Sequence, residues 1–334
     1  MLALALSLAL WAIAFRAKLS WWGFAHLVVF ALFAVGCLTA PWRRTAWRGL
    51  VRASVGAFYL ILVARVFNAT HTPTISLERL PGDHGARLLN AIVVERDGMI
   101  PAAMLLHATG GLRDAESAAL APALLAAYDR MGPDADAPTP AVATYLGLQR
   151  PTSFDAIVVD HAHDVPTGAV IFLHGYAGNF LVYCWEIAEA AERSGFVTVC
   201  PSVGARGDWW SPVGAENVQA TLEFLRAKGL RRVVLAGLSN GAAGASVIAA
   251  ARPKDFAGLV LISGTRAYAP PPMPVLVVQG SRDTMMPTNV IRAYAERGGA
   301  SVRYVELDGG HLVFLTRWKE MRQAVRDFLA QETP

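Results

Sequence analysis

The first 70 residues of this 334-residue chain contain no Asp and no Glu. They carry seven basic residues, whereas the rest of the chain carries 23 basic residues against 26 acidic ones, a net charge of −3. The net charge of +4 for the whole chain therefore arises at its front. This distribution excludes a basic nucleic-acid-binding face on the larger part of the chain, so no nucleic-acid partner is expected.

Apolar runs fill the segment that lacks acidic residues. They extend over Leu2–Phe15, Ser20–Trp42 and Gly49–Asn68. A helix needs about 20 apolar residues to cross a bilayer, a length that the second run meets clearly and the first run only marginally. The third run suffices if its arginines reach the interface. Tryptophans stand at the ends of the second run, as interfacial aromatic residues do. We expect residues 1–70 to form an integral membrane anchor of two or three helices.

No Lys or Arg precedes the first apolar run. Two more apolar runs follow it, so cleavage of a signal peptide would not leave a soluble protein. The link between the second and third runs carries Arg43, Arg44 and Arg48, whereas the link before it carries only Arg16 and Lys18. Positive charge stays on the cytoplasmic side of a membrane. We therefore expect the residues after the third run to lie on the non-cytoplasmic side.

No internal repeat is visible in the remaining chain, where strand and helix patterns alternate. Strands are predicted at 154–160, 168–174, 195–200, 231–237, 258–263, 274–280 and 301–307. Helices are predicted at 181–194, 215–229, 240–252, 287–298 and 316–331. This alternation predicts an α/β fold with a mostly parallel sheet and helices on both faces.

Three segments follow from these patterns. Residues 1–70 form the membrane anchor, residues 71–150 a linker and helical extension, and residues 151–334 a catalytic domain. Within the extension, residues 71–85 are polar with Pro and Gly, which is typical of a linker. Residues 86–131 are mostly helical, and we interpret them as a buttress or interface element rather than a cap.

The most informative motif is Gly237-Leu-Ser239-Asn-Gly241, which follows an apolar run and precedes a helical pattern. This G-x-S-x-G pattern is typical of a nucleophile elbow, a tight strand-to-helix turn that exposes a serine hydroxyl above a sheet. A side chain in place of either glycine would collide with the neighbouring strand or helix. The motif requires an acid and then a histidine after later strands.

Both partners are present in that order. Asp283 follows the predicted strand 274–280, and His311 follows the predicted strand 301–307. A serine hydroxyl is a weak nucleophile, so an imidazole must take its proton, and a carboxylate must hold the imidazole in the right tautomer. The sequence therefore predicts that Ser239, His311 and Asp283 form a catalytic triad.

An oxyanion hole is predicted from two backbone amides. The apolar strand 168–174 ends in His174 and a glycine turn, which places one donor at the N–H of Tyr176. The residue after the nucleophile supplies the second donor, the N–H of Asn240. Two such amides contribute roughly 3 kcal/mol each to stabilisation of the developing oxyanion.

Residues 154–331 resemble the α/β-hydrolase superfamily. The segment Gly280–Pro287, with His311 some residues later, is similar to the carboxylesterase, lysophospholipase and dienelactone-hydrolase branch. The resemblance implies the α/β-hydrolase fold and hydrolysis of esters or thioesters, sometimes of peptides, with no metal or organic cofactor. It does not define the substrate, because this fold supports many chemistries.

Three further residues are candidates for the substrate pocket. Trp209 and Trp210 follow the predicted strand 195–200, so they lie on the catalytic edge and either line an acyl pocket or pack in the core. His174 either faces the substrate or packs under its turn. The resemblance also implies that Cys184 and Cys200 lie at one edge of the sheet, where they form either a disulfide or two buried thiols.

We therefore expect a membrane-anchored serine hydrolase that cleaves carboxylic esters or thioesters through an acyl-enzyme intermediate. Its expected partners are the lipid bilayer and a small-molecule or lipid-like acyl substrate. Two alternatives remain open. One is a serine peptidase on the same fold, although the chain has no room for a propeller-like filter. The other is a non-catalytic hydrolase-like binding module, against which the complete triad argues.

Overall fold

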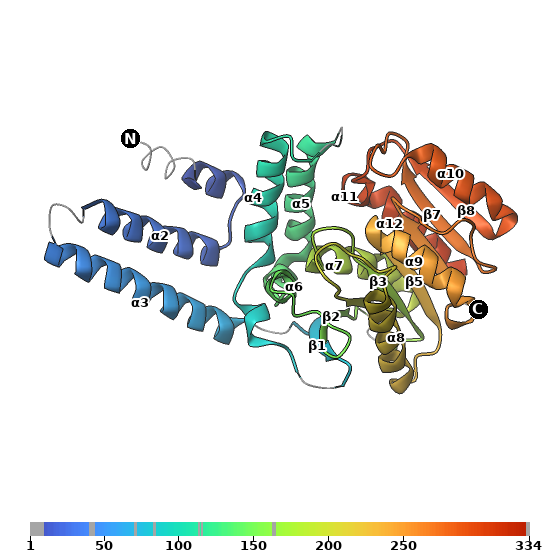
Figure 1. The fold of residues 1–334 in the computed structure, drawn as a ribbon, viewed down its shortest axis with the longest axis horizontal. Helices are drawn as coiled ribbons and strands as arrows, with labels where there is room; N and C mark the ends of the chain where they lie inside the picture. The colour runs from blue at the N-terminus through green and yellow to red at the C-terminus, as the bar shows by residue number, and fades with distance from the viewer. Residues whose placement is uncertain are drawn as a thin grey trace.

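An eight-stranded sheet crosses the molecule in the order β1-β2-β4-β3-β5-β6-β7-β8 (Figure 1). The computed structural model describes residues 10–39, 44–69, 72–82, 85–112, 114, 116–161 and 165–331. The strands are β1 (Ile75–Leu80), β2 (Phe154–Val159), β3 (Gly168–Leu173), β4 (Phe196–Pro201), β5 (Val233–Leu238), β6 (Gly258–Ile262), β7 (Val275–Gly280) and β8 (Val302–Leu307). β2 pairs antiparallel with β1 and β4, and the pairs from β4 to β8 are parallel. The expected α/β class and mostly parallel sheet are confirmed.

The central strands of the sheet are apolar along their whole length, as strands covered by helices on both faces must be. Every residue of β3, β4, β5, β6 and β7 is buried. Such continuous apolar runs are typical of parallel strands between two helical layers. The edge strand β8, by contrast, has no fully buried residue.

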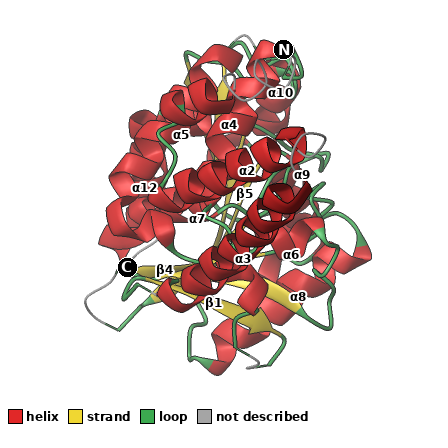
Figure 2. Cartoon of the chain, turned by 90° about the vertical axis from the view of Figure 1, so that its left-hand side faces the viewer, coloured by secondary structure: helices red, strands yellow, loops and turns green. Residues whose placement is uncertain are grey.

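Helices cover the two faces as separate layers (Figure 2). One apolar cluster joins the sheet to α5 (Ser117–Met131), α7 (Leu181–Ala191) and α12 (Trp318–Gln331), with α4 (Glu95–Ala108) and α11 (Val313–Thr316) beside them. The other joins the opposite face to α8 (Pro212–Ala227), α9 (Asn240–Ala251) and α10 (Thr288–Arg297). A short α6 (Ala141–Tyr145) precedes β2.

The expectation of a linker at 71–85 is wrong, because this segment contains the strand β1. Residues Ile75–Leu80 pair along their whole length with Phe154–Val159. Ile75, Leu77 and Leu80 are buried, whereas the residues between them are partly exposed. Only one face of an edge strand contacts the core, so its sequence contains both polar and apolar residues. Such a sequence is easily mistaken for a polar linker. The sheet therefore begins before residue 151.

The anchor is also simpler than expected. α2 (Trp21–Thr39) and α3 (Arg44–Asn68) form an antiparallel pair that projects from the body (Figure 1). In the described part of the chain, one helix is long and apolar enough to cross a membrane, at Trp47–Asn68. The apolar part of α2, Trp21–Cys37, is shorter than that. Most of the first apolar run, residues 2–9, lies outside the described residues. Among the described residues, there is thus one candidate span where two or three were expected.

Candidate active site

Ser239 occupies the turn between β5 and α9 with backbone angles φ 55° and ψ −116°. This is a sparsely populated region for a residue other than glycine. The neighbouring glycines allow the turn to form. A Cβ atom at Gly241 would overlap the backbone of Leu173 in β3, and one at Gly237 would overlap the backbone of Gly241. The local sequence therefore folds as the elbow that its glycines predict.

Three side chains meet at this turn from the ends of three strands. Ser239 Oγ lies 2.8 Å from His311 Nε2, and His311 Nδ1 lies 2.8 Å from Asp283 Oδ2. His311 and Asp283 are 6% and 5% exposed, so water has little access to the bond between them. The structure brings the three residues predicted for the triad into one hydrogen-bonded chain. Such an arrangement allows the imidazole to accept the serine proton.

The Asp283 carboxylate is held by donors on both oxygens. Its Oδ1 accepts hydrogen bonds from the backbone N–H groups of Met285 and Met286, each at 2.9 Å. Its Oδ2 accepts a bond of 3.0 Å from Gln279 Nε2 in addition to the bond from His311. These four contacts fix the orientation of the carboxylate beside His311. The carboxylate therefore fixes the Nδ1–H tautomer of His311 and leaves Nε2 free to accept.

The two predicted oxyanion donors lie beside the serine. Asn240 is the first residue of α9, where the backbone N–H has no partner within the helix. Tyr176 follows β3 and lines the same cavity as Ser239. A Cβ atom at Gly175 would lie 3.3 Å from the Cβ of Ser239, so the turn before Tyr176 passes close to the nucleophile. The assignment of both amides as oxyanion donors remains a prediction.

The cavity above Ser239 has a volume of about 280 Å³ and is predominantly apolar. Ser239 and His311 lie at its floor, and Tyr145, Tyr176 and Tyr183 supply further polar atoms. The apolar lining comes from Met99, Ala102, Ala103, Leu106, Leu112, Leu120, Leu124, Phe180, Leu238, Met285, Leu312, Phe314 and Leu315. Ligand sites are usually lined by apolar side chains with a small number of polar groups among them.

The helical extension, interpreted as a buttress or interface element rather than a cap, contacts the segment before α2 through Ser20 and Asp97 and also lines this cavity. Much of the apolar lining, from Met99 to Leu124, belongs to α4, α5 and the loop between them. These helices line the same cavity as Ser239 and His311, and we call α4, α5 and the loop between them the cap.

Two acidic residues of the cap hold the loop that carries His311. Asp114 Oδ2 accepts a hydrogen bond of 2.7 Å from the backbone N–H of His311. Glu116 Oε2 accepts one of 3.0 Å from Gly310 N and another of 3.0 Å from Thr316 Oγ1. Neither residue stands out in the sequence. Two acidic residues just before α5 are typical of a helix N-terminus, which is sufficient to explain them from the sequence. Their hydrogen-bond partners in the structure lie almost 200 residues away in the chain.

The three pocket candidates are placed elsewhere. His174 is fully buried, accepts a hydrogen bond from Val203 N at 3.2 Å on Nε2, and contacts Gly175 O at 2.8 Å through Nδ1. Burial lowers its pKa from 6.5 to about 4, so the ring is neutral.

Trp209 is also fully buried and donates from Nε1 to His174 O. Trp210 lies under the guanidinium of Arg266. None of the three lines the cavity above Ser239.

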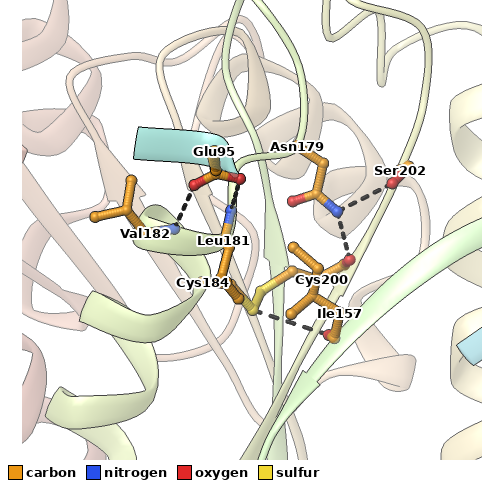
Figure 3. The surroundings of a disulfide bond; sticks show 8 residues. All are labelled: Glu95, Ile157, Asn179, Leu181, Val182, Cys184, Cys200 and Ser202. Atoms are coloured by element: carbon orange, nitrogen blue, oxygen red, sulfur yellow. Dashed lines mark hydrogen bonds between the residues drawn. A yellow bond between two sulfur atoms is a disulfide. The ribbon is translucent and has the colours of Figure 1, made fainter. Parts of the chain in front are cut away.

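Cys184 and Cys200 are joined in a disulfide (Figure 3). It links α7 to the end of β4. Next to it, the carboxylate of Glu95 accepts hydrogen bonds from the backbone N–H groups of Leu181 at 2.7 Å and Val182 at 3.0 Å (Figure 3). Glu95 begins α4, so this contact attaches the cap to the first turn of α7. Among the described residues, no group of three His, Cys, Asp or Glu side chains is placed to hold a metal ion.

Comparisons with known proteins found likenesses at the level of structure. No protein-family model matches the sequence, and no curated protein matches it either. Est1E from Butyrivibrio proteoclasticus with bound ferulic acid is 14% identical over 54% of this chain and 96% of its own, with a TM-score of 0.47. A thermophilic esterase from Thermogutta terrifontis is 16% identical over 55% and 96%, with a TM-score of 0.46. XC6422 from Xanthomonas campestris, a serine hydrolase without a lid, is 21% identical over 55% and 91%, with a TM-score of 0.44. Likenesses this remote assign no activity to this chain.

Proposed function

We propose that this protein is a membrane-anchored serine hydrolase that cleaves carboxylic esters or thioesters through an acyl-enzyme intermediate. The observation that carries the proposal is the chain of two 2.8 Å contacts from Ser239 Oγ through His311 to Asp283. A nucleophile, a base and an orienting carboxylate in this geometry are what acyl transfer requires. The elbow conformation of Ser239 and the apolar cavity above it agree with an acyl substrate.

In the proposed reaction, Ser239 Oγ attacks the acyl carbonyl carbon while His311 Nε2 takes the Oγ proton. The carbonyl oxygen becomes an oxyanion that accepts hydrogen bonds from the amides of Tyr176 and Asn240. The bond to the leaving alcohol or thiol then breaks, and His311 returns the proton to that group. Water next gives a proton to His311 and attacks the acyl-enzyme, which releases the acid and restores Ser239.

The proposal places the catalytic domain on the non-cytoplasmic side. Arg44 and Arg48 lie at the start of α3, with Arg43 outside the described residues, and no charged residue lies between Asn68 and Glu78. Positive charge at the start of the span favours a cytoplasmic start and a non-cytoplasmic end. The disulfide between Cys184 and Cys200 supports the same side, since disulfides persist in oxidising compartments.

The test is labelling of membranes with a fluorophosphonate probe, with wild type compared to Ser239→Ala and His311→Ala. The proposal expects labelling of the wild type and loss of labelling in both variants. A panel of acyl esters, acyl thioesters and aminoacyl amides then measures the reaction class. A folded wild type that neither labels nor hydrolyses any of them would overturn the proposal. A reporter that is active only outside the cytoplasm, fused at the C-terminus, tests the side.

A further inference from the structure

The cavity above Ser239 adjoins a larger apolar groove at the anchor end of the molecule. The groove has a volume of about 990 Å³. Met99, Ala102, Tyr145 and Phe180 line both spaces. Because the same four side chains form the boundary of each, the groove and the catalytic cavity are neighbours on either side of α4 and α6.

One wall of the groove belongs to the membrane anchor. Trp22, His26 and Phe30 of α2 line this wall together with Phe58 and Leu62 of α3, and the rings of His26 and Phe58 pack with their centroids 5.6 Å apart. These residues lie in the halves of α2 and α3 that are nearest the body (Figure 1). At 1.5 Å per residue, Phe58 lies about 15 Å along α3 from its end at Asn68. The groove therefore extends to roughly half the depth of a bilayer core of about 30 Å.

The opposite wall belongs to α4, and hydrogen bonds fix the two walls together. Ser20, just before α2, donates to Asp97 from its backbone N at 2.6 Å and from its Oγ at 2.5 Å. Arg96 donates to the carbonyl of Lys18 at 3.1 Å. Figure 1 shows α4 between the α2–α3 pair and the rest of the molecule, beside the start of α2. The groove is thus a space built between the anchor and the cap.

We propose that this groove is the route by which the acyl chain of a bilayer lipid reaches Ser239, so that the substrates are long-chain acyl esters of membrane lipids. The inference rests on the proposed serine hydrolase function and specifies its substrate class. Three observations carry it: the two spaces share four lining residues, their lining is predominantly apolar, and the groove opens beside the candidate membrane span. A lipid chain that follows this path lies beside predominantly apolar side chains, which favours its transfer from the bilayer.

The reaction at the end of the route is the one proposed above. The ester carbonyl carbon of the lipid forms a bond with Ser239 Oγ, and the bond to the glycerol or other alcohol oxygen breaks. The proton passes from Ser239 to His311 and then to that oxygen. The products are an acyl-enzyme, which water hydrolyses to a fatty acid, and a lipid that has lost one acyl chain.

A substitution that fills the groove tests the route. Gly98 lines the groove but not the catalytic cavity, and a Cβ atom there would have no neighbour within 4 Å. Gly98→Trp therefore places a large side chain in open space, and replacement of a helical glycine does not lower helix propensity. Gly56→Trp is the matched control. Gly56 also has open space, and it lies about 200° around α3 from Phe58, outside the groove lining.

The full-length protein is assayed in lipid nanodiscs with a long-chain acyl lipid in the bilayer and with a short, water-soluble ester. For Gly98→Trp, we expect the ratio of long-chain to short-chain rates to fall by about tenfold or more. For Gly56→Trp, we expect the ratio to equal that of the wild type. An unchanged ratio in Gly98→Trp overturns the route. A shift in oligomeric state with that unchanged ratio would assign the groove to a second copy of the chain instead.

Cross-linking gives a readout that does not depend on turnover. A fluorophosphonate with a long alkyl chain and a terminal diazirine reacts with Ser239: the Oγ–P bond forms, fluoride leaves, and the serine proton passes to His311. Illumination expels N₂ from the diazirine, and we expect the resulting carbene to insert into a C–H or other X–H bond of a residue in α2, α3 or the groove face of α4. Attachment only to residues of the sheet domain would overturn the route.

The two proposals fail in different ways. If the wild type hydrolyses the short ester but neither the bilayer lipid nor any other long-chain ester, the substrate class is wrong and the serine hydrolase function stands. If the wild type hydrolyses neither substrate and does not react with the fluorophosphonate, both proposals are wrong.

Discussion

The carboxylate of Asp114 accepts a hydrogen bond of 2.7 Å from the backbone N–H of His311, although the two residues are 197 positions apart in the chain. Asp114 belongs to the loop between α4 and α5, and His311 carries the imidazole that contacts Ser239. The cap over the cavity therefore also holds the loop of the candidate catalytic base. The position of the cap and the alignment of His311 are therefore coupled through this contact.

Loss of the hydrogen bond between Asp114 and the His311 N–H should slow ester hydrolysis, although all three triad residues remain in place. In Asp114→Ala, the buried N–H of His311 loses its acceptor, a cost of about 1–3 kcal/mol. If this cost falls on the aligned state of His311, kcat should fall by about 10- to 100-fold with a smaller change in KM. Asp114→Asn retains an acceptor oxygen and should recover part of the rate. Equal rates of fluorophosphonate labelling in wild type and Asp114→Ala would contradict this positioning role.

Asp283→Asn should be far more damaging than its small change in shape suggests. The two backbone donors at Met285 and Met286 would hold the amide oxygen, so the amide nitrogen would face His311 Nδ1. His311 would then carry its proton on Nε2 and could not accept one from Ser239. The loss in kcat should be roughly 10⁴-fold, the size known for the wrong tautomer in serine proteases. Ester hydrolysis and circular dichroism together check that activity, and not folding, is lost.

Glu95→Gln should destabilise the attachment of the cap. Each Glu95 oxygen accepts from one backbone N–H of α7, and Tyr128 and Thr139 donate hydroxyl bonds to the same carboxylate. A glutamine must turn its NH₂ group toward one of those N–H donors. Loss of one buried bond to an acceptor costs about 1–3 kcal/mol. Urea unfolding should show this difference in the free energy of unfolding.

The control for Glu95 is Glu216→Gln, which makes the same change on the exposed face of α8. An exposed substitution of this kind should alter stability by less than about 0.5 kcal/mol. Similar unfolding midpoints for the two variants would show that the Glu95 contacts do not stabilise the fold.

His174 should make the protein sensitive to mild acid. Burial lowers its pKa from 6.5 to about 4, and its Nε2 already accepts a bond from Val203 N, so a proton there would meet another donor. A lowered pKa in the folded state means that the stabilisation is fully present above pH 6.5 and is lost as pH falls toward 4. The wild type should therefore lose more stability across this window than His174→Gln does. Unfolding curves at pH 7.5, 6 and 4.5 measure the difference, and parallel losses in both proteins would refute the assignment.

The disulfide should stabilise the folded state in proportion to the loop that it closes. Cys184 and Cys200 are 16 positions apart. In the chain-entropy description, a loop of this size contributes about 3 kcal/mol. Reductant should lower the unfolding temperature of the wild type and leave that of the double variant Cys184→Ala/Cys200→Ala unchanged. If reductant acts equally on both proteins, the bond contributes nothing to stability.

Local patterns in the sequence were enough to predict the sheet strands from 154 to 307 and the helices between them. Each strand is a short apolar run with a turn at its end, so the local pattern marks the strand before its partners in the sheet are known. The elbow glycines, Ser239, Asp283 and His311 were predictable for the same reason, since each follows a strand in the order that the turn chemistry requires.

The tertiary structure alone decided the features that depend on what lies beside a residue. Asp114 and Glu116 resemble a helix start until the fold brings the His311 loop against them. The sequence does not distinguish a tryptophan that packs in the core from one that lines a pocket. The structure shows that Trp209 is fully buried in the core. The role of α4 and α5 as a cap, the place of β1 in the sheet and the groove beside the anchor arise from contacts between segments far apart in the chain. Local periodicity reports which face of an element is apolar, whereas the partner of that face is set by how the whole chain packs.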